Sequence, residues 1–63
     1  MYFIELTNNL TKQPIYFNAA HIAIIEDTPG GVIILLVNDR DFITVTESLS
    51  EVLAKIDALP AIK

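Results

Sequence analysis

The chain has 63 residues, of which 52% are hydrophobic, and its four basic and eight acidic residues give a net charge of −4. It contains no cysteine, which excludes disulfides, thiolate metal sites and a cysteine nucleophile. The basic residues are scattered, so the sequence lacks the positive patch that attracts phosphate and argues against nucleic acid as a partner. We expect a single small domain over residues 1–63, with a thin core because a chain of this length buries only about 60% of its unfolded surface.

No segment of the sequence predicts insertion into a membrane. The longest apolar run, Val32 to Val37, has six residues, whereas a membrane-spanning helix needs about 20. The N-terminal residues lack the basic region, the apolar core and the cleavage site of a signal peptide. We therefore expect a cytoplasmic protein without a membrane partner.

The first part of the chain predicts two strands joined by a polar turn. Residues 2–7 and 15–17 are rich in apolar and aromatic residues and flank the polar segment NNLTKQ. Pro14 at the start of the second strand favours an edge position, because proline has no N–H to donate. The segment from Asn18 to Ala20 predicts a corner rather than a hairpin.

The middle of the chain predicts two hairpins that share one strand. In the segment TPGG, residues 28–31, Pro29 suits a turn position with φ near −65°, and Gly30 suits the next position, which needs a positive φ. The segment NDRD, residues 38–41, is a second polar turn. Strands are therefore expected over residues 21–27, 32–37 and 42–46, with two-residue loops at 29–30 and 39–40.

The C-terminal segment predicts an amphipathic helix from Leu49 to Leu59. Ser48 and Glu51, three residues apart, have the spacing of a capping box, so Ser48 is the expected N-cap. Pro60 ends the helix. Apolar residues recur at the helical period along one stripe: Leu49, Val52, Leu53, Ile56 and Leu59.

Together these elements predict an α+β fold, a four- to five-stranded antiparallel β-meander with one C-terminal helix packed on one face. Side chains alternate between the two faces of a strand, so the three central strands have two sets of side chains. The first set is purely aliphatic and is expected beneath the helix: Ala23, Ile25, Val32, Ile34, Leu36, Ile43 and Val45.

The second set is too apolar for a surface in water, but it includes threonine and glutamate, as interfaces do. It consists of Ile22, Ile24, Glu26, Ile33, Leu35, Val37, Phe42, Thr44 and Thr46. Leaving five large side chains exposed would lose about 1.5–3 kcal/mol each relative to burial, a sum comparable with the stability of a small domain. We therefore predict a homo-oligomer with an interface formed by Ile22, Ile24, Ile33, Leu35, Val37 and Phe42.

Several residues occur in the order and spacing of a known family. They are Asn18, Ile22, Ile25-Glu26, Thr28-Pro29, Ile33, Leu35, Asn38, Val45, Glu47-Ser48 and Glu51-Val52. In this series the chain resembles the FlbD family of flagellar and swarming-motility proteins, over about residues 4–56. It departs from the family at Asn38-Asp39, where the family favours Asn-Gly, and in the first hairpin, which lacks the usual glycine. The resemblance implies a link to motility and carries no catalytic residues.

Three groups of residues are of types that can form a catalytic, metal-binding or base-stacking site. His21 could act as a base or a metal ligand beside Asp39 or Asp41. A histidine that is hydrogen-bonded at the surface, without a catalytic role, is the favoured interpretation. Asp39 and Asp41 lack the further oxygen ligands of a calcium loop, and Glu26-Asp27 lie at the other end of the hairpin. The aromatic residues are better explained by packing than by stacking on bases, because no basic residues accompany them; they are Tyr2, Phe3, Tyr16, Phe17 and Phe42.

The sequence thus predicts no enzyme, no metal site and no cofactor, but a homo-oligomeric interaction module that is linked to motility through the family. One alternative is a small acidic subunit or antagonist that contacts a basic surface on a larger protein. A nucleic-acid-binding sheet is the other alternative, and the net charge argues against it.

Overall fold

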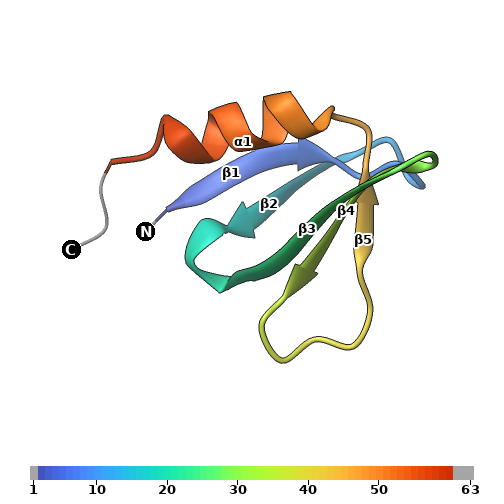
Figure 1. The fold of residues 1–63 in the computed structure, drawn as a ribbon, viewed down its shortest axis with the longest axis horizontal. Helices are drawn as coiled ribbons and strands as arrows, with labels where there is room; N and C mark the ends of the chain where they lie inside the picture. Colours follow the sequence, from blue (N-terminus) through green and yellow to red (C-terminus); the bar gives the residue numbers. More distant parts are fainter. Residues whose placement is uncertain (1, 61–63) are drawn as a thin grey trace.

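The computed structural model describes residues 2–60, which form an α+β fold with a C-terminal helix, as predicted (Figure 1). The helix lies along the first strand, and the remaining strands fan out beneath it. In chain order the elements are β1 (Phe3–Thr7), β2 (Pro14–Asn18), the 3-10 helix η1 (Ala19–His21), β3 (Ile22–Thr28), β4 (Gly31–Leu36), β5 (Ile43–Val45) and α1 (Leu49–Asp57).

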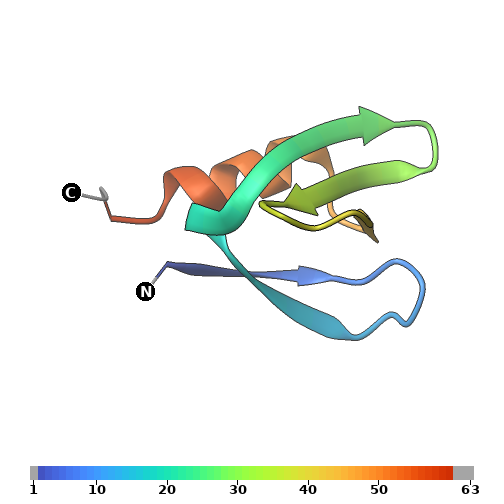
Figure 2. The same ribbon diagram turned by 90° about the horizontal axis from the view of Figure 1, so that it is seen from below.

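The strands form two antiparallel sheets, β1-β2 and β3-β4-β5, rather than one continuous meander. A single bridge between Asn8 and Val45 joins the sheets, and beside it the Asn9 amide donates to the Thr44 carbonyl at 2.8 Å. The corner predicted at Asn18 is η1, where the Asn18 side chain accepts a hydrogen bond from the Ala20 amide. Figure 2 shows the result: the β1-β2 and β3-β4 hairpins lie apart, with α1 behind them.

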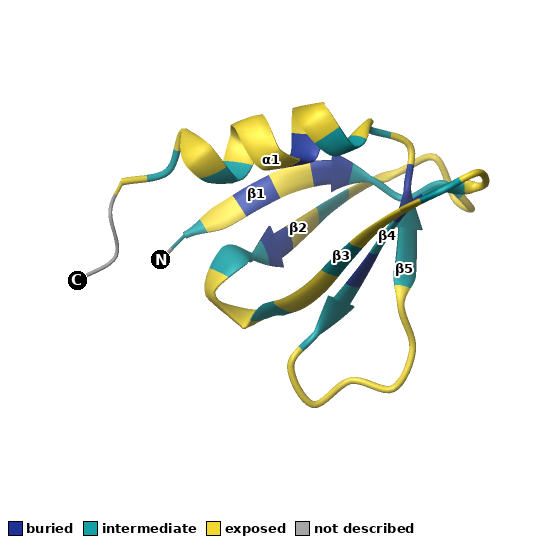
Figure 3. Cartoon of the chain, viewed as in Figure 1, coloured by how far each residue is buried: buried dark blue, intermediate teal, exposed yellow. Residues whose placement is uncertain are grey.

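The core lies between the two sheets and the helix. Ile4 pairs with Phe17 and Leu6 pairs with Ile15, so the apolar residues of β1 and β2 share one face. These side chains and Val52 of α1 pack with residues of the first predicted face of the central strands in one cluster. Figure 3 shows buried positions on β1, β2, β4 and α1. The buried residues are Ile4, Leu6, Phe17, Val32, Ile34, Val45 and Val52. The sequence predicts that the helix alone covers this face of the central strands. In the structure, the helix and the β1-β2 hairpin cover it together.

The β3-β4 hairpin has the predicted register from Thr28↔Gly31 to Ile24↔Leu35. A bulge then interrupts the ladder, and Ile22 pairs with Leu36 instead of Val37. A one-residue shift moves a side chain to the opposite face. The expectation that Ile22 shares a face with Ile24 is therefore wrong, and Ile22 packs partly against the core.

The glycine that needs a positive φ is Gly31, with φ = 130°, and not Gly30 as predicted. A Cβ at Gly31 would lie 2.9 Å from Thr44 Cγ2 and 3.2 Å from the Val45 carbonyl oxygen, whereas a Cβ at Gly30 would make only an ordinary contact with Thr28 Oγ1, at 3.9 Å. Gly31 therefore lets β4 begin close against β5. The hairpin is closed by Thr28 Oγ1, which donates to the Gly31 carbonyl at 2.6 Å.

The β4-β5 hairpin differs from the prediction by two residues. Ile34 pairs with Ile43, so the loop runs over residues 37–42 instead of two residues. Asn38 has φ = 69°, a left-handed conformation that asparagine tolerates. Because a shift by two keeps each side chain on its face, the predicted division into two faces survives in β4 and β5.

The helix begins as predicted. Ser48 is the N-cap, its Oγ accepts from the Glu51 amide at 3.2 Å, and the Glu51 carboxylate accepts from the Ser48 amide at 3.2 Å. The helix ends at Asp57, two residues before Leu59. Leu53 is half-exposed because it lies about 100° around the helix from the buried Val52.

Candidate interaction surface

The side of the β3-β4-β5 sheet that faces away from the core is apolar, and we call it the outer face. Cross-strand pairing places its residues together: Ile24 opposite Leu35, and Ile33 between Glu26 and Thr44. Val37 and Phe42 continue the face at the ends of the adjoining loop. The outer face thus consists of Ile24, Glu26, Ile33, Leu35, Val37, Phe42 and Thr44.

Large side chains on the outer face are exposed to solvent. Ile24 is 50% exposed, Val37 51% and Phe42 58%, while Ile33 and Leu35 between them are partly buried. Five of the six residues predicted for the interface lie on this face, and Ile22 does not. Contiguous apolar surface of this kind is typical of an interaction site.

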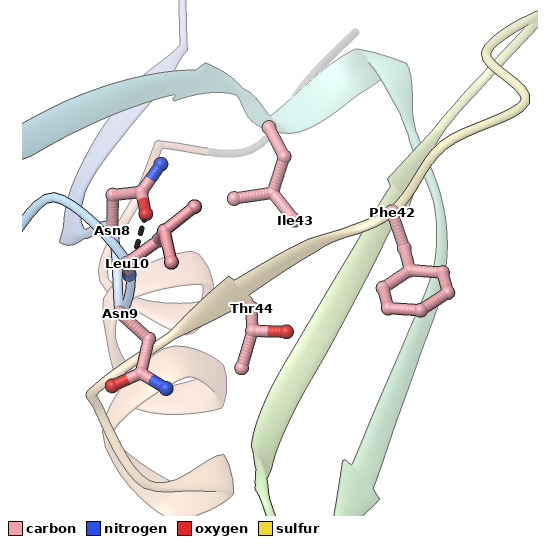
Figure 4. Close-up of a pocket in the computed structure, with 6 residues that line it drawn as sticks. All are labelled: Asn8, Asn9, Leu10, Phe42, Ile43 and Thr44. Atoms are coloured by element: carbon pink, nitrogen blue, oxygen red, sulfur yellow. Dashed lines mark hydrogen bonds between the residues drawn. The ribbon is translucent and has the colours of Figure 1, made fainter.

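A depression of about 430 Å³ adjoins the outer face at Phe42 (Figure 4). It lies between the β1-β2 turn and β5, and is lined by Asn8, Asn9, Leu10, Phe42, Ile43 and Thr44. In the close-up, Phe42 and Thr44 point to one side of β5 and Ile43 points to the other. Leu10, which is 90% exposed, contributes an apolar side chain to this depression on the Ile43 side of β5. Sequence reasoning missed it because it lies in a segment that reads as a polar turn.

Charged residues lie at the two ends of the outer face. Glu26 is exposed on this face near the β3-β4 turn, whereas the loop at the other end carries Asp39, Arg40 and Asp41. The apolar centre is therefore bounded by mostly acidic ends. Polar ends around an apolar centre are the usual arrangement of a protein–protein contact.

The structure places His21 away from the position that the predicted register gave it. It is an exposed residue at the end of η1, and its carbonyl accepts from the Val37 amide, so it does not lie opposite Asn38 as the predicted register required. Among the described residues, no group of three or more metal-binding side chains exists.

The aromatic residues divide between the core and the surface. Phe17 is 2% exposed and belongs to the core. Phe3 and Tyr16 are exposed on the outer side of β1-β2, separate from Phe42 on the outer face. They do not form a single stacking platform.

Most residues of the family series have a structural role. Asn18 caps η1, Thr28 closes the β3-β4 hairpin, and Asn38 adopts a left-handed conformation in the loop between β4 and β5. Val45 and Val52 are fully buried. The resemblance therefore rests largely on residues that make the fold.

Comparison with known proteins identifies a family. A family model named FlbD and described as flagellar and swarming motility proteins matches residues 3–61. No significant match was found among curated proteins or among solved structures. Within residues 2–60, α1 is too short to cross a bilayer.

Proposed function

The chain belongs to the FlbD family of flagellar and swarming motility proteins, and we propose that it serves motility as a non-enzymatic, cytoplasmic interaction module that associates with copies of itself. The proposal needs no reaction. It requires a surface whose burial by another subunit lowers the free energy of the assembly.

The observation that carries this proposal is the exposure of Ile24, Val37 and Phe42 on the outer face, opposite a face that is buried. Completing the burial of such side chains contributes roughly 25 cal/mol per Å² of apolar surface removed from water. The small core has little stability in reserve, since domains of this size are marginal. A second subunit on the outer face would supply the missing burial.

Light scattering of Leu35→Glu tests the proposal. Leu35 lies at the centre of the outer face, so a glutamate there would place a charge against the apolar surface of the other copy. The mass of the assembly should fall below that of the wild type at the same micromolar concentration. Leu53→Glu is the control, because it places the same charge at an exposed leucine on the helix, away from the outer face. Equal masses for Leu35→Glu and the wild type would count against the outer face.

A contact with a different protein is the alternative use of the outer face. The exposed carboxylate of Glu26 on this face would suit a basic partner. A wild-type protein that remains monomeric but binds a basic motility protein in purified form would favour this alternative.

A further inference from the structure

The outer edge of β3 is free along the strand. β3 has seven residues and ends the order β3-β4-β5, and within residues 2–60 no backbone hydrogen bond joins it to β2. Figure 2 shows β3 at one margin of the molecule and the β1-β2 hairpin at the other. An unpaired edge of this length can accept a further strand.

The hydrogen-bond pattern identifies the backbone groups that face this edge. The Thr44 carbonyl accepts a hydrogen bond from the β1-β2 turn, so the backbone groups of Thr44 face β1 rather than β4. Thr44 pairs with Ile33, and Ile33 pairs with Glu26. Because bonding directions alternate along an antiparallel ladder, Ile33 faces β3 and Glu26 faces β4. The neighbours Ile25 and Asp27 therefore direct their N–H and C=O groups to the free edge.

The side chains at the edge are apolar in the first half of β3 and acidic in the second half. Ile24 is half-exposed on the outer face, and Ile25 is partly buried on the core side. Glu26 and Asp27 follow directly. A strand that adds to this edge would cover both isoleucines. It must not place further acidic residues opposite Glu26 and Asp27.

We infer that β3 pairs antiparallel with β3 of a second copy about a two-fold axis at Ile25, which joins two three-stranded sheets into one. This inference rests on the proposed self-association and assigns a second contact to it. The axis at Ile25 places Glu26 opposite Ile24 of the other copy, and Asp27 opposite Ala23. The acidic half of each strand thus meets the uncharged half of the other.

The other two-fold registers are worse. An axis at Glu26 would place two glutamates directly opposite each other, which is destabilising. An axis at Ile24 would carry the pairing into η1, where the backbone is not extended. Parallel pairing in register would place Glu26 beside Glu26 of the other copy and Asp27 beside Asp27. The axis at Ile25, the middle residue of β3, keeps the pairing within the strand, and the bulge between Ile22 and Ile24 lies at its beginning.

Edge pairing leaves the outer face free for the contact proposed above. The two-fold axis runs perpendicular to the joined sheet, so both outer faces lie on the same side of it. The face contact and the edge contact are therefore separate interfaces, and each can be removed without the other.

Engineered cysteines test the register, because the chain has no cysteine of its own. Ile24 and Glu26 of the second copy would form a non-hydrogen-bonded pair with Cα atoms about 4.5 Å apart, which a disulfide can bridge. Two copies of the same position would be diagonal neighbours about 7–8 Å apart, beyond that reach. Ile24→Cys and Glu26→Cys, each in the Leu35→Glu background, should form a covalent dimer under diamide when mixed and little when oxidised alone. Equal cross-linking in all three samples, or none, would overturn the register.

Asp27→Pro tests the edge without cross-linking. Proline removes only an outward N–H and is tolerated on an edge strand, and Asp27→Asn removes the same charge while keeping the N–H. In the Leu35→Glu background, Asp27→Asn should sediment as a dimer and Asp27→Pro as the 7.0 kDa subunit. Each variant must keep the wild-type circular dichroism spectrum. Equal sedimentation of the two folded variants would overturn the edge contact.

Hydrogen exchange of the wild type provides a measurement without substitution. The amides of Ile25 and Asp27 should be protected in the assembly and should lose protection on dilution. Rapid exchange of both amides in the assembled protein would overturn the inference.

The two proposals also fail differently: a wild type that is monomeric overturns both, whereas an assembly that Leu35→Glu converts directly to single subunits overturns only the edge contact.

Discussion

Thr7 and Glu47, forty residues apart in the sequence, are joined through both oxygens of the Glu47 carboxylate. The Thr7 amide donates to Oε1 at 2.8 Å, and Thr7 Oγ1 donates to Oε2 at 3.0 Å. This pair ties the end of β1 to the residue that precedes the N-cap of α1. Burial by itself raises the pKa of Glu47, but the hydrogen bonds from Thr7 and the charge of Lys55 outweigh it and hold the pKa below its ordinary value of 4.5.

Glu47→Gln should lower the free energy of unfolding by about 1 kcal/mol at neutral pH, because an amide cannot accept both hydrogen bonds as a charged group does. Since the folded pKa is depressed, the carboxylate contributes its stability above the unfolded pKa and loses it as pH falls through the folded value. The difference between the wild type and Glu47→Gln should therefore shrink below pH 4.5. Urea denaturation at several pH values measures it, and a difference independent of pH would contradict this role for the charge.

Ser48→Ala should lower the free energy of unfolding by about 1 kcal/mol, because the Glu51 amide loses its acceptor at the helix N-terminus. Ser50→Ala is the control, since Ser50 is an exposed residue within the helix and has no capping role. Chemical denaturation should separate the two variants. An unchanged midpoint for Ser48→Ala would mean that the capping box contributes nothing to stability.

Gly31→Ala should destabilise the protein by roughly 1–3 kcal/mol, because alanine is strained at φ = 130° and its Cβ would meet Thr44 and Val45. Gly30→Ala is the matched control: its Cβ would have only Thr28 Oγ1 nearby, at 3.9 Å. The thermal midpoints of the two variants give the comparison. Similar midpoints would contradict the close approach of β4 to β5.

Local patterns in the sequence predicted local structure well. Three features depend on interactions within a few residues: the capping box at Ser48, the β3-β4 turn between Thr28 and Gly31, and the alternation along β4. These interactions are the same in a short segment and in the folded chain, so spacing and residue type suffice to predict them.

Features that depend on contacts between distant segments were not predictable in the same way. The bulge that moves Ile22 to the core side and the long loop before β5 depend on how the strands fit the β1-β2 hairpin. Gly31 needs its conformation because β5 lies against it. Alternation along β4 was enough to predict the outer face, but excluding Ile22 from it required the three-dimensional arrangement.

Self-association also predicts that thermal stability depends on concentration. If the native state is an assembly, mass action stabilises it as the protein concentration rises. The wild-type midpoint should increase across a hundredfold range of concentration in differential scanning fluorimetry. Phe42→Ser, which removes a half-exposed ring from the outer face, should weaken this dependence. A wild-type midpoint that stays constant would contradict the assembly.

Sedimentation velocity of the wild-type protein over the micromolar range tests self-association most directly. The subunit has a mass of 7.0 kDa. We predict a species of at least twice this mass at micromolar concentration, with a sedimentation coefficient that falls on dilution as subunits dissociate. A single species of 7.0 kDa throughout the range would contradict the proposal that the outer face binds a second copy of the chain.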